Sequence, residues 1–162
     1  MESRTKLFGH AVHPMLIVFP LGLLSTAVVF DIISMATGNG FWSQMSFWMI
    51  AAGILGGILA APFGAMDWLA IPSGTRASRV GFVHGVGNVF VLVLFAASWW
   101  LRRDTPEVPS LLAMCFSFVG VGAALVTAWF GGELVHRLGV GVDEGAHVDA
   151  PSSLTTRRTV RG

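Results

Sequence analysis

Four long apolar runs, separated by short polar intervals, dominate the pattern along the chain. They cover approximately residues 14–35, 41–69, 82–101 and 111–135. Runs of about twenty or more apolar residues are typical of membrane-spanning helices rather than of core helices in soluble proteins. The pattern therefore predicts an all-α integral membrane protein, a bundle of four transmembrane helices within residues 10–138. A short polar lead over 1–9 and a mobile tail over 139–162 would flank it.

Prolines and small residues add detail to these spans. Pro20 and Pro62 lie inside the first and second spans, where a missing N–H is expected to bend the helix. Small residues recur every four positions in the second and fourth spans: Ala52, Gly56, Ala60 and Gly64, then Gly120, Ala124, Ala128 and Gly132. Such stripes let helix backbones approach closely. They predict packing surfaces, either within the bundle or in a homo-oligomer.

The composition agrees with a membrane protein and excludes several other classes. Charged residues make up 12% of the 162-residue chain, against about 25% in average soluble domains, and the mean hydropathy is +0.71. The net charge of +1 and the lack of a basic, aromatic-laced patch give no reason to expect nucleic-acid binding. Cys115 is the single cysteine, so one chain can form no disulfide framework. The first run is too long for a signal peptide and is expected to remain as a span.

The distribution of basic residues predicts the orientation. Four spans place both termini and the 71–80 loop on one side of the membrane. That side holds eight basic residues: Arg4, Lys6, Arg76, Arg79, Arg137, Arg157, Arg158 and Arg161. The other side holds Arg102 and Arg103, and discounting the distant tail still leaves five against two. The positive-inside rule then places the termini in the cytoplasm, and the chain in the inner, or plasma, membrane.

This topology brings histidines and acids from all four helices to one cytoplasmic layer. They are His10 and His13 from the first span, Asp67 from the second, His84 from the third, and Glu133 and His136 from the fourth. Imidazoles and carboxylates at the edge of the lipid are expensive to place, and so mark candidate functional positions. We treat these six residues as candidate metal ligands and the four histidines as candidate haem ligands.

Each of these candidates also has a purely structural interpretation. His10 and His13 lie three apart and could chelate a metal or pack at the interface. His84 shares a helix face with Asn88, so it could be a ligand or a histidine bonded to Asp67 or Glu133. Glu133 and His136 have the Glu-x-x-His spacing of carboxylate metal sites, although Asp67 is the one further acid at this depth.

Asp31 is a separate case, because it lies about 25 Å along the first helix from Pro14, near the opposite surface. It could form an ion pair with Arg102 or Arg103, or it could serve a proton or cation relay. The sequence leaves both roles open.

The two halves of the chain look related. Val12-His13 with Val18-Phe19 is similar to Val83-His84 with Val89-Phe90 at a shift of 71, whereas the small-residue stripes match at 68. A duplication of one hairpin would give a pseudo-two-fold axis along the membrane normal and would place His13 opposite His84. The two different shifts leave the duplication open.

Several motifs together resemble the bacterial membrane-protein family catalogued as domain of unknown function 2231. These are Gly9-His10-x-x-His13-Pro14 with Phe19-Pro20 and Asp31, His84-Gly85 with Asn88, and Gly131-Gly132-Glu133-Leu134-Val135 before Gly139-Val140-Gly141-Val142. The resemblance covers about residues 8–143. The family has no established activity, and related domains occur beside Rieske or cytochrome-type modules. The resemblance thus implies a link to membrane electron transfer.

Three hypotheses for function follow. The first is a small redox subunit that holds one b-type haem or a metal, with His13 and His84 as axial ligands and a membrane or peripheral redox partner. The second is a proton or cation pathway that uses Asp31 and the His/acid cluster. The third is an accessory subunit with no chemistry of its own. No phosphate-binding loop or nucleophile–base arrangement is present in the sequence, so no enzyme class is predicted.

Overall fold

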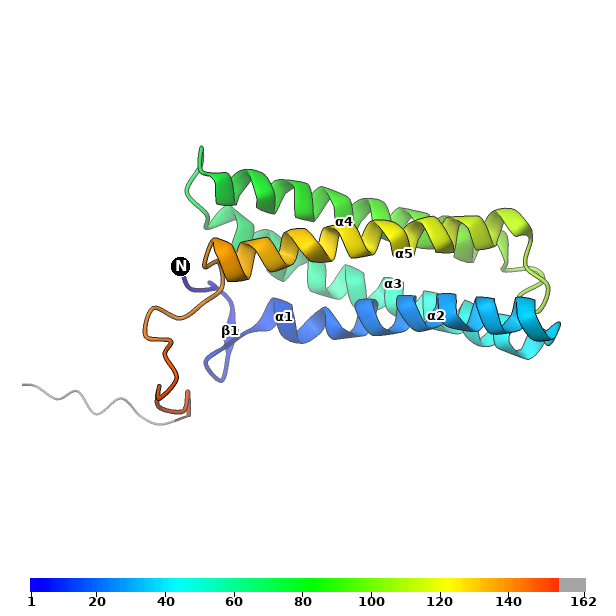
Figure 1. Cartoon of the computed structure of the whole chain (residues 1–162), viewed down its shortest axis with the longest axis horizontal. Helices are drawn as coiled ribbons and strands as arrows, with labels where there is room; N and C mark the ends of the chain where they lie inside the picture. Colours follow the sequence, from blue (N-terminus) through cyan, green and yellow to red (C-terminus); the bar gives the residue numbers. More distant parts are fainter. Residues whose placement is uncertain (155–162) are drawn as a thin grey trace, which may run out of the picture.

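The computed structural model describes residues 1–154, and within them the fold is almost entirely helical (Figure 1). Four stretches in this part of the chain are long and apolar enough to cross a membrane: Val12–Thr37, Gly40–Leu69, Arg76–Leu101 and Leu111–Arg137. Each is 26 to 30 residues long, whereas a bilayer core needs about 20 helical residues. The predicted class, an all-α bundle of four membrane-spanning helices, is confirmed.

The bundle consists of two antiparallel hairpins that lie side by side. The first pairs α1 (Val12–Leu16) and α2 (Val18–Thr37) with α3 (Gly40–Leu69). The second pairs α4 (Arg76–Leu101) with α5 (Leu111–Gly132), and the hairpins meet through α3 against α4 and α2 against α5. The N-terminus, the α3–α4 loop and the end of α5 lie at one end of the bundle (Figure 1). We call this the histidine end.

The helix boundaries depart from the predicted spans mainly at the third helix. The prediction began this helix near residue 82, but α4 begins at Arg76. The hydroxyl oxygen of Thr75 accepts a hydrogen bond from the Ser78 amide at 3.1 Å, which caps the helix. Hydropathy placed these polar residues in a loop, because it does not register a capping interaction.

Pro20 was predicted to distort the helix of the first span, and the helix is distorted about one turn before this residue. The helix is interrupted at Ile17, between α1 and α2. Because Pro20 has no N–H, the carbonyl of Leu16 has no intrahelical donor four residues on, and the regular hydrogen-bond ladder breaks there. Pro62, by contrast, lies inside the continuous helix α3.

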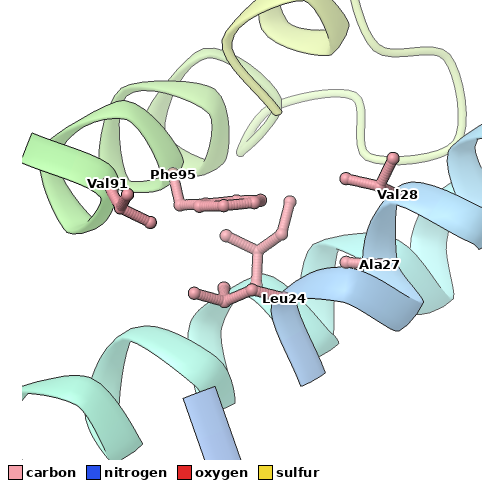
Figure 2. Close-up of a cluster of buried hydrophobic side chains, with 6 residues drawn as sticks. Leu24, Ala27, Val28, Val91 and Phe95 are labelled. Atoms are coloured by element: carbon pink, nitrogen blue, oxygen red, sulfur yellow. The ribbon is translucent and has the colours of Figure 1, made fainter. Parts of the chain in front are cut away.

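The hydrophobic core lies in the middle of the bundle, where α2 faces α4 (Figure 2). Leu24, Ala27, Val28, Ile50, Val91 and Phe95 form this cluster. A Cβ on Gly53 would come within 2.6 Å of Leu24, and one on Gly120 within 2.8 Å of Phe95, so each large side chain fills the space that a glycine of its partner helix leaves. At the histidine end no residue of α1 is buried, whereas Ile71 and Leu134 are.

The residues before α1 pack onto the histidine end. Strands β1 (Lys6–Leu7) and β2 (His10–Ala11) form a small antiparallel sheet. The Met1 amine donates to the carbonyl of Gly139 at 2.8 Å, and the Gly141 amide donates back to Met1 at 2.9 Å. The chain after α5 is therefore tied to the N-terminus at its start. The last part of the predicted mobile tail, residues 155–162, lies outside the described residues.

Candidate functional site

His13, on α1, is held against α3 by its ring nitrogen Nδ1. This atom lies 3.1 Å from the backbone carbonyl oxygen of Ala60. A carbonyl only accepts hydrogen bonds, so Nδ1 carries the proton and donates it. The imidazole also lies directly over Gly64, where a Cβ would come within 2.7 Å of the ring. The glycine is what lets the ring approach α3 so closely.

His84, on α4, makes the same two contacts with α5. Its Nδ1 donates to the carbonyl oxygen of Thr127 at 2.9 Å, and a Cβ on Gly131 would come within 3.1 Å of the ring. The Asn88 amide donates to the His84 carbonyl at 2.8 Å and lies 3.3 Å from the ring nitrogen Nε2. Asn88 also accepts from the Thr127 hydroxyl at 3.2 Å. The polar residues predicted to share a face of this helix do so.

The two histidines thus share two contacts, a hydrogen bond from Nδ1 to a backbone carbonyl and a close approach to a glycine, whereas the Asn88 contacts belong to His84. In each, a proton on Nδ1 leaves Nε2 with the lone pair of the neutral ring. Histidine ligands of metals usually donate their other ring nitrogen to a carbonyl or carboxylate in this way. The two rings come from different hairpins at the histidine end of the bundle, and the Nε2 atom of His84 also lies 3.3 Å from the Asn88 amide nitrogen.

The other predicted members of this layer have separate partners. His10 lies in β2, exposed, with Nδ1 3.3 Å from the Phe8 carbonyl oxygen. Both Asp67 oxygens accept from the Ser3 hydroxyl, at 2.7 and 2.9 Å. Glu133 pairs with Arg76 at 2.7 Å, and His136 is exposed. Within residues 1–154, no three His, Cys, Asp or Glu side chains come together closely enough to hold a metal ion.

Asp31 and Arg102 form a fully buried polar contact at the opposite end of the bundle from the histidines. Both side chains are fully buried, and the guanidinium donates to the two carboxylate oxygens at 2.8 and 3.0 Å. Two parallel bonds of this kind fix both distance and orientation. Of the two partners that the sequence left open for Asp31, the structure contains Arg102.

Three serines accept further hydrogen bonds from the two terminal nitrogens of the guanidinium, and sequence reasoning missed them. Ser46 accepts at 3.2 Å, Ser98 at 3.0 Å and Ser117 at 3.1 Å. The internal repeat was the signal that could have found this group. Arg102 lies 71 residues after Asp31, and Ser117 lies at the same shift from Ser46, which is also the shift between the two histidines.

The contacts relate the two hairpins by more than one shift: Ala60 and Thr127 are 67 residues apart, whereas the two histidines are 71 apart. His13 and its carbonyl partner are 47 residues apart, whereas His84 and its partner are 43 apart. The difference of four residues is close to one helical turn. At the histidine end, the residue of the second helix that accepts the hydrogen bond from the histidine is thus about one helical turn closer in sequence in the second hairpin than in the first. A shift of one turn keeps the same face of that helix toward the histidine.

The small-residue stripes are used mainly inside the chain. A Cβ on Gly56 would approach Phe19 and Pro20 at 3.0 and 3.2 Å, and Gly64 and Gly120 accommodate His13 and Phe95. The predicted packing surfaces therefore join the helices within each hairpin. A homo-oligomer through the same glycines would have to compete with these contacts.

Outside the membrane-spanning segments, Lys6 joins the N-terminal sheet to the segment after α5. Its ammonium group pairs with Asp143 and, at 2.7 Å, with Glu2. The hydrogen bond from Lys6 holds the pKa of the Asp143 carboxyl below its usual value, and the same bond raises the pKa of Lys6. These ion pairs reinforce the backbone contacts of Met1.

The comparisons with known proteins agree with this architecture. The family model described as "Predicted membrane protein (DUF2231)" matches residues 9–144. The chain belongs to this family. A UPF0060 membrane protein of Herpetosiphon aurantiacus is 32% identical over 87 residues, which are 54% of this chain and 72% of that protein. No solved structure matches.

Membership in the DUF2231 family confirms the resemblance seen in the motifs and makes the chain a multi-pass membrane protein. The matched region contains the two histidines, the two glycines beneath them and the Asp31–Arg102 pair. Neither the family description nor the relative's name states an activity.

Proposed function

We propose that this DUF2231 protein is a small membrane redox subunit that binds one b-type haem between His13 and His84. The observation that carries the proposal is the matched pair of Nδ1–H···O=C hydrogen bonds to Ala60 and Thr127. Bis-imidazole ligation needs two histidines from facing elements at one depth, each with Nε2 available. When bound, haem supplies one-electron transfer, and its axial ligands and burial tune the potential.

The small number of protein ligands at the histidine end favours haem over a bare ion. Haem needs few ligands from the protein, whereas a hydrated ion would need a shell of oxygen or nitrogen donors. Gly64 and Gly131 bring each histidine ring against a helix backbone, which fixes the position of both rings.

The competing hypotheses have less support. A metal ion without a porphyrin would need three or more ligands, and no such group exists within residues 1–154. A proton or cation pathway would need Asp31 to exchange its charge. Its carboxylate is fully buried in a bidentate pair with Arg102, and protonation would break that pair. The remaining alternative is an accessory subunit, in which both histidines serve only as packing residues.

We also propose that the chain lies in a bacterial inner membrane, with the histidine end facing the cytoplasm. The N-terminal segment, the start of α4 and the end of α5 lie at this end (Figure 1), and these segments contain Arg4, Lys6, Arg76, Arg79 and Arg137. At the opposite end, the charge of Arg102 is compensated by Asp31, so Arg103 is the remaining exposed arginine of the α4–α5 connection. The difference in positive charge between the two ends of the bundle, on which the positive-inside rule depends, is therefore larger than the count of basic residues alone gives.

The visible spectrum of the protein, purified in detergent after expression with ample haem supply, tests the haem proposal. We expect a Soret band and the sharp α-band of low-spin, bis-histidine haem. His13→Ala and His84→Ala should each convert the spectrum to a high-spin form or abolish it. Added imidazole should restore the low-spin form in His84→Gly, because it replaces the missing ligand.

His10→Ala and His136→Ala are the matched controls, because these histidines lie at the same end but have exposed side chains. Both should keep the wild-type spectrum. A correctly folded, colourless wild-type protein would overturn the haem proposal and favour the accessory role. Loss of the spectrum in His10→Ala with retention in His13→Ala would show that the ligands were wrongly assigned.

A further inference from the structure

The polar end of α5 contains a shallow cavity that the proposed haem site does not use. Its volume is about 250 Å³, and it is lined by Trp129, Gly132, Glu133, His136 and Arg137. The last three residues belong to the π-helix η1 (Glu133–Arg137), which closes the fourth membrane-spanning stretch. The cavity therefore lies where this helix leaves the membrane, at the level of the lipid headgroups.

The charge of this cavity is positive. The carboxylate of Glu133 forms an ion pair with Arg76 at 2.7 Å, so its charge is neutralised. Arg137 is exposed and forms no ion pair with any residue of the described chain, 1–154. Its guanidinium, with His136 next to it, is thus available to an anion, and a guanidinium can bind a phosphate through two parallel hydrogen bonds.

A second hollow, an apolar groove, lies nearer the middle of the membrane-spanning part of α5. Its volume is about 290 Å³, it lies between α4 and α5, and its lining includes Val83, Phe90, Val126, Thr127 and Phe130. On α5 the two hollows are neighbours, because Trp129 of the cavity and Phe130 of the groove are consecutive residues whose ring centroids lie 5.1 Å apart.

The two cavities together match an amphipathic ligand. We propose that they form a binding site for one anionic glycerophospholipid, with its phosphate on Arg137 and one acyl chain in the α4–α5 groove. A soluble phosphate would use the charged cavity but leave the groove without an occupant. Trp129 is 62% exposed beside the charged cavity, and aromatic rings at this depth pack against the glycerol region. This inference does not depend on haem binding.

Lipid retention measured by native mass spectrometry tests the site. The detergent-purified protein is incubated with mixed micelles that contain phosphatidylglycerol or phosphatidylcholine. We expect the wild type to retain one phosphatidylglycerol in preference to phosphatidylcholine. Arg137→Gln should lower that retention about five-fold, the effect of one basic residue near a membrane surface. Val126→Trp should lower it as well, because the indole would fill the groove.

Arg79→Gln is the matched control, since Arg79 is an exposed arginine at the same end that does not line the cavity. It should leave retention unchanged, and Arg137→Lys should keep most of it, which guards against a folding defect in Arg137→Gln. Equal losses in Arg79→Gln and Arg137→Gln would show general surface attraction and overturn the proposal. Full displacement by inorganic phosphate, with no effect of Val126→Trp, would also overturn it, because the ligand would then be a free anion.

Discussion

Arg102 lies 71 residues after Asp31, and their side chains form a fully buried, bidentate ion pair at 2.8 and 3.0 Å. The same separation relates His84 to His13. Residues at equivalent positions of the two hairpins thus carry opposite charges and meet at the hairpin interface. The pair links α2 to the end of α4.

Removal of one partner of this pair should strongly destabilise the bundle. We expect Asp31→Asn and Arg102→Gln each to lower the free energy of unfolding by about 3–5 kcal/mol, because an unpaired charge or polar group stays buried. Thermal unfolding in detergent measures the effect. Arg103→Gln is the control, since Arg103 is 43% exposed and its partner Asp104 is 85% exposed, and it should change little.

A double variant distinguishes the energy of the Asp31–Arg102 interaction from the contacts that each side chain makes with its other neighbours. Asp31→Leu with Arg102→Met should be less destabilised than either single variant, because no uncompensated charge then remains. Strictly additive losses would contradict a direct interaction between the two side chains.

The glycines beneath the histidines should be sensitive to one added methyl group. In Gly64→Ala the new Cβ would come within 2.7 Å of the His13 ring, and in Gly131→Ala within 3.1 Å of the His84 ring. We expect a loss of stability of about 1–3 kcal/mol from overpacking, larger at position 64. Gly85→Ala and Gly122→Ala are controls, since no atom lies within 4 Å of either added Cβ. Thermal unfolding of all four variants in the same detergent compares them, and equal losses would contradict the contacts described.

The Lys6–Asp143 pair should make the contact between the N-terminal sheet and the segment after α5 depend on pH. The lowered pKa of Asp143 means that its contribution is present above 3.8 and is lost as the pH falls through the lowered value. The raised pKa of Lys6 means that its contribution is present below 10.5 and is lost as the pH rises through the raised value. The contact should therefore be strongest between these limits.

An NMR titration of the Asp143 carboxyl checks this prediction. In Lys6→Gln the pKa of Asp143 should return toward 3.8, and protease cleavage after Gly139 should become faster. Arg4→Gln should have neither effect, because Arg4 contacts Asp67 through its backbone amide. An unchanged Asp143 pKa in Lys6→Gln would mean that Lys6 does not hold this carboxylate in solution.

The orientation of the bundle can be tested with cysteine labelling. In a Cys115→Ser background, Ser73→Cys lies in the α3–α4 loop and Thr105→Cys in the α4–α5 loop, and both positions are exposed. With a membrane-impermeant maleimide, Thr105→Cys should react in right-side-out vesicles and Ser73→Cys in inverted ones. The reverse pattern would place the histidine end outside the cytoplasm.

The candidate site was only partly predictable from the sequence. The depth of His13 and His84 followed from their distance to the ends of apolar runs, because helix rise converts sequence position to depth. Their partners did not follow, since both are backbone carbonyl groups, of Ala60 and Thr127, that leave no signature in the side-chain pattern. The expected cluster with Asp67 and Glu133 did not form, because Ser3 and Arg76 bind these acids.

By itself the sequence determined the four membrane-spanning helices, the end of the bundle to which each polar residue belongs, and the family. Those properties depend on the length and spacing of apolar runs, which are local. The tertiary structure alone decided that Asp31 pairs with Arg102 rather than Arg103. It also decided that the rings of His13 and His84 each pack against a glycine of their own hairpin. These contacts depend on how each helix is rotated and shifted against its neighbours. Residues 71 positions apart come into contact only when packing fixes both the rotation and the shift of their helices. The apolar pattern does not reveal the shift, because it stays the same when a helix moves by one turn.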